Sequence, residues 1–399
     1  MGTHSSPRSS HSSAELRCGR TDGREGGIIR VRPQHWTETA LSLLDAPLAL
    51  PDLRPFALID PDGTVRDSGA LPDRDTLLEL YRRMVIGRRF DAQATALTKQ
   101  GRLAVYPSSR GQEACEVAAV LALGERDWLF PTYRDCVAIV TRSVDPVEVL
   151  SLLRGEWHCG YDPNMHRVAP QCTPLATNTL HGVGLAHAAR LKGEDAAVLV
   201  LLGDGATSEG DTHEALNFAA VWHAPVVFLV QNNGYAISVP LSKQTAAPSL
   251  AHKAIGYGMP GRLIDGNDPA GVYVSVKAAL DAARRGEGPT LIEGVTYRIE
   301  AHTNADDATR YRSSEEVQHW LARDPLARLD RHLRSIRALD DDSAAAISAS
   351  AEAFADDVRT RMNIDVSPSP DLLFDNVYAE PTAQLNRQHA QLRAELSDD

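Results

Sequence analysis

Two short polar motifs, each at the end of an apolar run, contain the residues best suited to chemistry. The first is Gly203-Asp204-Gly205, and the second is Asn232-Asn233. A carboxylate, an amide oxygen and nearby backbone carbonyls are hard oxygen donors, a set that favours Mg²⁺ over zinc or copper. Magnesium takes its remaining ligands from phosphates and water, and the two glycines let a bulky anion approach the backbone. The residues therefore predict a Mg²⁺-diphosphate site that includes Asp204 and Asn233.

The elements around these motifs predict that the two lie together. Residues 196–202 are all apolar, which is typical of a strand buried on both faces of a parallel sheet. Ser208 and Asp211 have capping-box spacing and predict a helix start, and residues 225–230 form a second apolar strand. Such a βαβ unit places both motifs at the carboxyl edge of the sheet, where ligands bind. The alternative is two unrelated turns, each of which is common by itself.

Further elements follow from the pattern of the chain. A helix is expected from Asp73 to about Lys99, and a short strand at 56–59. Asp268-Pro269 has the residue types of an N-cap followed by the first helical position. Residues 154–174 are expected to form a loop. Residues 301–312 contain few apolar anchors, and we expect a mobile loop there.

The residues around both motifs resemble the alpha subunit of the thiamine diphosphate-dependent 2-oxo acid dehydrogenase (decarboxylating) component. The runs that carry the resemblance are 203–211, 231–238 and 296–312, and it extends over about residues 75–390. The fingerprint formed by the two motifs is moderately specific, and the third run makes the match strong. The resemblance implies an α/β thiamine diphosphate-binding fold, with a mainly parallel sheet and helices on both faces.

The resemblance also implies the cofactors, thiamine diphosphate and Mg²⁺, and the residues that bind them. The expected metal ligands are Asp204, Asn233 and the carbonyl oxygen of Tyr235. His302 is the expected catalytic residue, because the family has a loop histidine beside the reacting carbon and histidine titrates near neutral pH. Without the resemblance, His302 and Arg134 would be interpreted as ordinary surface residues. The expected cofactor-binding residues are Tyr133, Arg134, Thr173, Leu175, Asp204, Gly205, Ala206, Asn233, Tyr235, Ile237 and His302.

The implied activity is oxidative decarboxylation of a branched-chain 2-oxo acid, with acyl transfer to the lipoyl group of an acyltransferase component. Pyruvate is the alternative substrate, because bacterial pyruvate relatives share Gln231-Asn232-Asn233. Acetoin cleavage and a non-catalytic Mg²⁺-diphosphate scaffold are further alternatives. In the family a beta subunit supplies an activating Glu, so the resemblance implies an α₂β₂ assembly. Gln231 replaces a phosphate-binding Arg of some relatives, which argues against that contact with phosphate here. Thr303 replaces a regulatory Ser of animal relatives, which argues against control by a kinase.

Composition narrows the classes of function. A net charge of −12 argues against a nucleic-acid binder, and no apolar run reaches the roughly 18 residues of a membrane span. The five cysteines form no C-x-x-C pair, which fits a reducing, cytoplasmic location. We expect a disordered tail at 1–34, an N-terminal extension at 35–74, the cofactor domain at 75–340 and a C-terminal helical segment at 341–399.

Overall fold

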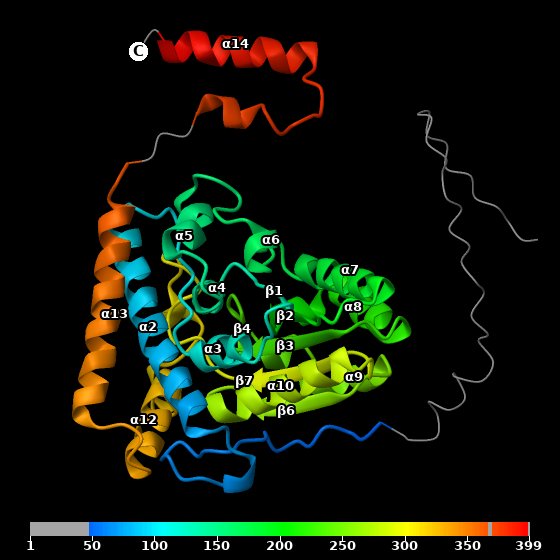
Figure 1. Cartoon of the computed structure of the whole chain (residues 1–399), viewed down its shortest axis with the longest axis vertical. Coiled ribbons are helices and arrows are strands. Elements are labelled where there is room, and N and C mark those ends of the chain that lie inside the picture. The colour runs from blue at the N-terminus through cyan, green and yellow to red at the C-terminus, as the bar shows by residue number, and fades with distance from the viewer. Residues whose placement is uncertain (1–47, 366–368, 398–399) are drawn as a thin grey trace, which may run out of the picture. The chain divides into compact units, whose positions relative to one another are not determined.

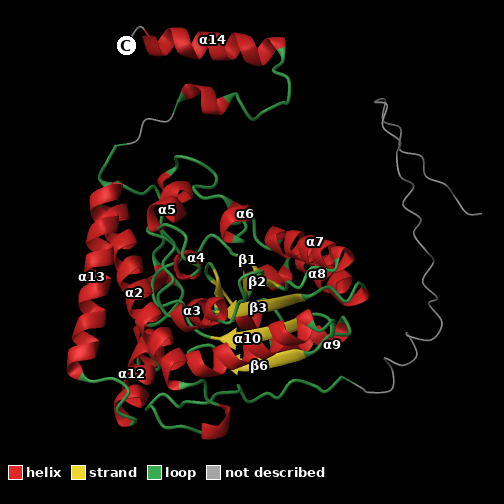
Figure 2. Ribbon diagram, in the orientation of Figure 1, coloured by secondary structure: helices red, strands yellow, loops and turns green. Residues whose placement is uncertain are grey.

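A five-stranded sheet of order β1-β2-β3-β7-β6 lies at the centre of the chain, and every neighbouring pair of its strands is parallel (Figure 1, Figure 2). The computed structural model describes residues 48–365 and 369–397, so the expected tail at 1–34 and residues 35–47 of the expected extension lie outside the described residues. The strands are β1 (Trp128–Phe130), β2 (Val198–Gly203), β3 (Val226–Asn232), β6 (Gly261–Asp265) and β7 (Thr290–Val295).

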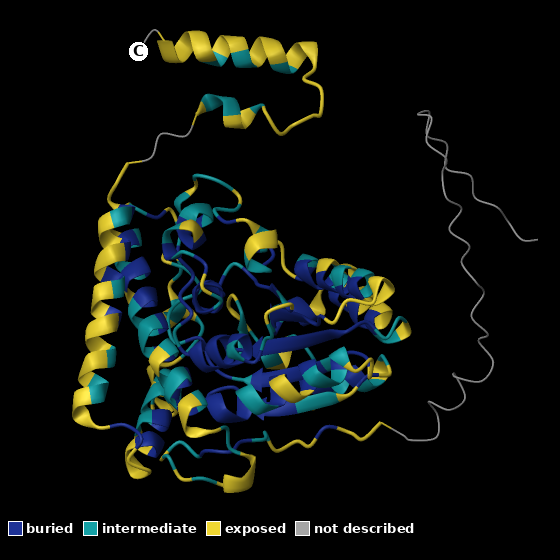
Figure 3. Cartoon of the chain, in the orientation of Figure 1, coloured by how far each residue is buried: buried dark blue, intermediate teal, exposed yellow. Residues whose placement is uncertain are grey.

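The sheet is buried on both faces (Figure 3). Leu199 and Leu201 of β2 lie in one hydrophobic core, whereas Val198 and Val200 lie in a second. Because successive side chains of a strand point to opposite faces, an unbroken apolar run supplies both cores at once. The prediction of a mainly parallel sheet with helices on both faces is confirmed.

Two sets of helices supply the rest of these cores. The core with Leu199 contains residues of α2 (Arg74–Lys99), α3 (Glu113–Leu121), α4 (Cys136–Thr141), α5 (Pro146–Arg154), α10 (Pro269–Arg284), α12 (Pro325–Ser335) and α13 (Asp341–Met362). The core with Val198 contains residues of α7 (Thr177–Lys192), α8 (Gly210–Val221) and α9 (Lys253–Gly256). The remaining elements include α6 (Pro163–His166), α11 (Ser314–Leu321) and the antiparallel pair of β4 (Tyr235–Ala236) and β5 (Val239–Pro240).

The C-terminal part of the chain contains two separate features. Helix α13 packs along α2, so this portion of the expected C-terminal segment contributes to the same core as the sheet. The segment after residue 368 contains a 3₁₀ turn at Pro370–Leu373 and α14 (Ala383–Ser397). Asp371 in that turn accepts a 2.6 Å hydrogen bond from His389 of α14, and the charge of Arg393 supports the contact.

The helix start expected at Ser208 and Asp211 is wrong in detail. Gly205–Ser208 forms a 3₁₀ turn, and α8 begins at Gly210 without a side-chain cap. The hydroxyl of Thr207 donates to the Asp204 carbonyl at 2.8 Å, which tightens the turn directly after β2. Local side-chain bonds to the backbone therefore replace the capping box.

The strand expected at 56–59 is also wrong. This segment makes only isolated bridges, Phe56 to Ile264 and Ile59 to Val65, because a side chain takes two of its N–H groups. The loop expected at 154–174 contains the short helix α6.

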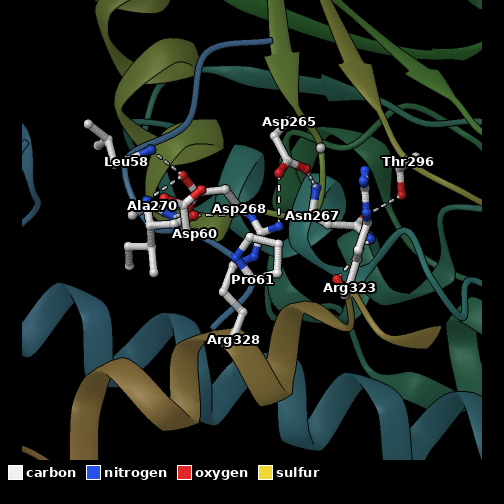
Figure 4. A network of polar contacts seen from close by, with 12 residues as sticks. Leu58, Asp60, Pro61, Asp265, Asn267, Asp268, Ala270, Thr296, Arg323 and Arg328 are labelled. Carbon is white, nitrogen blue, oxygen red and sulfur yellow. Dashed lines mark hydrogen bonds and ion pairs between the residues drawn. The ribbon is translucent and has the colours of Figure 1, made fainter. Parts of the chain in front are cut away.

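Asp268 holds the N-terminal segment against the end of the sheet (Figure 4). Its Oδ2 accepts hydrogen bonds from the N–H groups of Leu58 at 2.6 Å and Ile59 at 3.1 Å. Its Oδ1 accepts from the N–H of Ala270, which confirms Asp268 as the N-cap of α10. The buried Arg328 donates to the Ile59 carbonyl and completes the attachment.

Replacing Asp268 with Ala should lower the free energy of unfolding by about 2 to 4 kcal/mol, because buried N–H groups lose their acceptor. Chemical denaturation of the full-length chain measures the change. Asp67→Ala removes the cap of an exposed 3₁₀ turn and serves as the control. Its expected effect is about 1 kcal/mol or less, and equal losses in the two variants would contradict the buried attachment.

Candidate functional site

A cavity of about 170 Å³ lies at the carboxyl ends of β2 and β3, next to the segments that follow β1 and β7. Each of the expected cofactor-binding residues except Thr173 lines it: Tyr133, Arg134, Leu175, Asp204, Gly205, Ala206, Asn233, Tyr235, Ile237 and His302. Thr173 is exposed and stands outside this lining. The fold thus brings together residues from five separate parts of the chain.

The two polar motifs meet at this edge of the sheet. Asp204 is 1% exposed, and the N–H of Asn233 donates to its Oδ1 at 3.3 Å. Asn233 Oδ1 accepts from the N–H of Tyr235 at 3.3 Å. A Cβ on Gly205 would lie 2.8 Å from the Cβ of Ala236, so glycine permits the close approach of the two motifs.

The oxygens gathered here suit a hard divalent cation. Three residues of the cavity lining carry such oxygens, namely the carboxylate of Asp204, the amide of Asn233 and the backbone carbonyl of Tyr235, which are donor types that Mg²⁺ prefers. Burial raises the pKa of Asp204, because the charged carboxylate is separated from water. Among the described residues, no group of three or more His, Cys, Asp or Glu side chains could hold a metal ion. A metal at this edge would therefore depend on the amide and carbonyl oxygens as well.

Two arginines fix the state of His302. Arg134 Nη2 lies 3.1 Å from His302 Nδ1, and Arg298 Nη1 lies 3.3 Å from the same nitrogen. A guanidinium group only donates, so Nδ1 is the acceptor and the ring proton lies on Nε2. Burial, together with the charges of Arg134 and Arg298, lowers the pKa of His302 to about 4. His302 is thus neutral near pH 7 and presents an Nε2–H donor.

This charge state has a testable pH dependence. The folded protein should protonate His302 at a pKa of about 4, whereas the unfolded chain does so at about 6.5. The stability contributed by neutral His302 is complete above the unfolded pKa and is lost as the pH falls through this window. An NMR titration of the histidine ring should show a constant signal through neutral pH, and Arg298→Gln should raise the pKa. A wild-type midpoint near 6.5 would contradict the arrangement.

The segment that contains His302 is attached at several points. The N–H of His302 donates to Asp306 at 2.8 Å, and Arg298 donates to the Ile237 carbonyl at 2.6 Å. Ile237 has a φ of +55°, a strained conformation for a β-branched residue, and this places its carbonyl beside the arginine. The expected loop is confirmed, with a single 3₁₀ turn at Ala308–Arg310, while its mobility stays a prediction.

Buried amide side chains connect Asn233 to a second carboxylate in the cavity wall. Asn233 Nδ2 donates to Gln112 Oε1 at 2.9 Å, and Gln112 Nε2 donates to Gln231 Oε1 at 2.9 Å. Gln231 Nε2 donates to Asp135 Oδ1 at 2.6 Å. The other oxygen of Asp135 accepts from the backbone N–H of Thr132 at 2.6 Å.

Sequence reasoning missed Gln112, Asp135 and Gln244. Gln244 donates to Asp204 Oδ2 at 2.7 Å, although it lies outside both motifs. Asp135 directly follows Arg134, and this adjacency was the one available signal. Burial raises the pKa of Asp135, while its hydrogen-bond donors and the charge of Arg134 favour the ionised form.

Fold and cavity together define the class of protein: a parallel α/β protein with a cavity at the carboxyl edge of its sheet, the edge where ligands bind in such folds. Residues 81–365 match the model of one family, the dehydrogenase E1 component. The chain belongs to this family, a family of thiamine diphosphate-dependent enzymes. The family predicted from the motifs is confirmed.

Two relatives show how far the similarity extends. The chain is 48% identical over 354 residues to the 3-methyl-2-oxobutanoate dehydrogenase subunit alpha of Mycobacterium tuberculosis, covering 87% of this chain and 95% of the relative. It is 41% identical over 282 residues to the pyruvate dehydrogenase E1 component subunit alpha of Staphylococcus aureus, covering 70% and 76%. Among the described residues, no helix has the length and apolar character that a membrane crossing requires.

Proposed function

We propose that this chain is the alpha subunit of a branched-chain 2-oxo acid dehydrogenase that acts on 3-methyl-2-oxobutanoate. The observation that carries the proposal is the 48% identity, which extends over 95% of the mycobacterial alpha subunit. The pyruvate relative is less similar, at 41% identity over 76% of its length. Pyruvate is therefore the second candidate substrate.

The cofactor in this proposal is thiamine diphosphate tethered by Mg²⁺. Asp204, Asn233 and the Tyr235 carbonyl would hold the cation, and Arg134 would neutralise charge on the diphosphate. Arg134 is 5% exposed and lines the cavity, and its guanidinium is held in place by hydrogen bonds to the Ser108 carbonyl and to His302. When bound, thiamine diphosphate supplies the electron sink for loss of CO₂ from a 2-oxo acid.

The protein residues in this proposal position the reactants and control one proton. His302, held neutral by burial and by its two arginines, would donate a hydrogen bond from Nε2 to an oxygen of the reacting group. The arginines thereby keep the donor available over the whole neutral range. Tyr133 packs edge-on against the His302 ring, with centroids 6.2 Å apart, and limits its rotation.

A partner chain completes the site in this proposal. A cavity of about 170 Å³ is smaller than the roughly 300 to 1,000 Å³ of a typical cofactor pocket. Two apolar residues of its lining, Leu175 and Ile237, are 37% and 55% exposed, as expected for a surface that another chain covers. The proposed assembly is an α₂β₂ heterotetramer with a beta subunit, in the cytoplasm, that passes its acyl group to a lipoyl-bearing acyltransferase component.

Steady-state assays of the chain co-expressed with its beta subunit test the proposal. With 3-methyl-2-oxobutanoate the value of kcat/KM should exceed that with pyruvate by roughly 10- to 200-fold, the range for a small apolar difference in one pocket. The isolated chain should be inactive with both substrates. A preference for pyruvate would assign the chain to a pyruvate dehydrogenase instead.

A further inference from the structure

The side-chain amides behind Asn233 all donate in one direction. Each NH₂ group donates to the next residue, from Asn233 to Gln112, then Gln231, and finally Asp135. Gln112 and Gln231 are each 2% exposed, and Asp135 is fully buried. Water therefore has little access to these groups, and each amide depends on its neighbour for a hydrogen-bond partner.

The carboxylate of Asp135, at the end of this row of amides, determines the direction of the hydrogen bonds. Both oxygens of Asp135 accept hydrogen bonds, Oδ1 from Gln231 and Oδ2 from the N–H of Thr132. Gln231 must therefore point its NH₂ group at Asp135 and its oxygen at Gln112. Gln112 in turn must point its oxygen at Asn233, whose NH₂ group is thereby directed away from the cation site.

We propose that Asp135, Gln231 and Gln112 act as a relay that makes Asn233 present its oxygen, rather than its NH₂ group, to the cation. Gln112 and Gln231 are thus positioning residues, and the inference rests on the proposed function because it assumes a cation beside Asn233. The relay assigns a role to Gln231, which stands where some relatives have an Arg.

The opposite orientation of the Asn233 amide is unfavourable among these neighbours. If Asn233 were rotated, its oxygen would face Gln112 Oε1, and its NH₂ group would face the Tyr235 N–H that now donates to Oδ1. One acceptor would then face another acceptor, and one donor would face another donor, in a buried site. Such unpaired buried groups are costly, so the relay and the Tyr235 N–H select the same orientation.

The backbone next to Gln112 is held in place as well. The hydroxyl of Thr296 donates to the Gly111 carbonyl at 2.6 Å, and Gly111 has a φ of +99°. A Cβ at Gly111 would lie 2.0 Å from the Tyr297 carbonyl oxygen, so the chain can pass here only as glycine. The middle of the relay is therefore fixed against the segment that follows β7.

The test measures Mg²⁺ affinity rather than turnover. In the co-expressed α/β complex, saturated with thiamine diphosphate, Mg²⁺ is titrated by calorimetry. Gln231→Leu removes the relay without changing charge, and Asp135→Asn removes its anchor with almost no change in shape. Each should weaken Mg²⁺ binding by about 10- to 100-fold, as does the loss of outer-shell partners at other metal sites. Gln231→Glu keeps the acceptor for Gln112 but loses the NH₂ group that donates to Asp135, so it should weaken Mg²⁺ binding as Gln231→Leu does.

Asp127→Asn is the matched control, because Asp127 is an equally buried carboxylate that binds Arg284 at the opposite, amino end of β1. It should lower the thermal unfolding temperature and leave the Mg²⁺ affinity unchanged. Wild-type affinity in both Gln231→Leu and Asp135→Asn would overturn the relay and leave the proposed function standing. A wild-type complex that fails to bind Mg²⁺ and thiamine diphosphate would overturn the proposed function and the relay together.

Discussion

Replacing Asp204 with Asn should weaken Mg²⁺-dependent binding of thiamine diphosphate by more than about 100-fold, beyond the usual cost of losing an outer-shell partner. Asp204 supplies the one full negative charge among the three candidate oxygen ligands, and Asn has nearly the same shape. Loss of the charge therefore removes attraction to the cation while the packing around the 1% exposed side chain is kept. Quenching of tryptophan fluorescence by the cofactor, titrated in the α/β complex, measures the affinity.

Asp211→Asn provides the comparison for this variant. Asp211 lies in the first turn of α8 and is outside the cavity lining. It carries the same charge close by, and its replacement should change the cofactor affinity by less than about threefold, because surface charges interact weakly through water. If the two variants lost affinity equally, general electrostatics rather than direct ligation would explain the effect.

Replacing His302 with Ala should reduce acyl transfer to the lipoyl group by at least about 100-fold, the lower range for loss of a general acid–base group. Cofactor affinity should stay within about threefold of wild type, because the candidate cation ligands lie directly after β2, directly after β3 and on β4 rather than on this loop. Reductive acylation of a lipoylated domain gives the first quantity, and a cofactor titration gives the second.

Thr303→Ala is the neighbouring control, since the Thr303 hydroxyl makes its one described contact within its own loop, to Ala305. It should retain nearly full activity. Normal acylation by His302→Ala would remove His302 from the chemistry. A parallel loss of cofactor affinity would assign it a binding role instead.

The strands and the edge where their polar ends meet were predictable, because they depend on local pattern. An apolar run of strand length followed by Gly203-Asp204-Gly205 has few other solutions, and parallel connections place such ends together. Asp268-Pro269 was equally predictable, since capping is a property of adjacent residues. The start of α8 was not, because the Thr207 hydroxyl competes for backbone groups in a way that spacing does not reveal.

The amide relay could not have been predicted from the sequence. Gln112 and Gln231 are 119 residues apart, and only the packing of α3 against the sheet edge brings them to 2.9 Å. The state of His302 was hidden for the same reason. A loop histidine alone indicates titration near neutral pH, whereas burial and the charge of Arg134, which is 168 residues away in the sequence, lower its pKa together with the charge of the nearby Arg298.

The claim on which the account depends is that Asp204, Asn233 and the Tyr235 carbonyl bind one cation. A crystal structure of the α/β complex with Mn²⁺ and thiamine diphosphate, using anomalous scattering to locate the metal, tests it directly. We expect a single anomalous peak within about 2.0 to 2.3 Å of these three oxygens and in contact with the diphosphate. A peak elsewhere, or diphosphate bound without a metal between it and Asp204, would contradict the account.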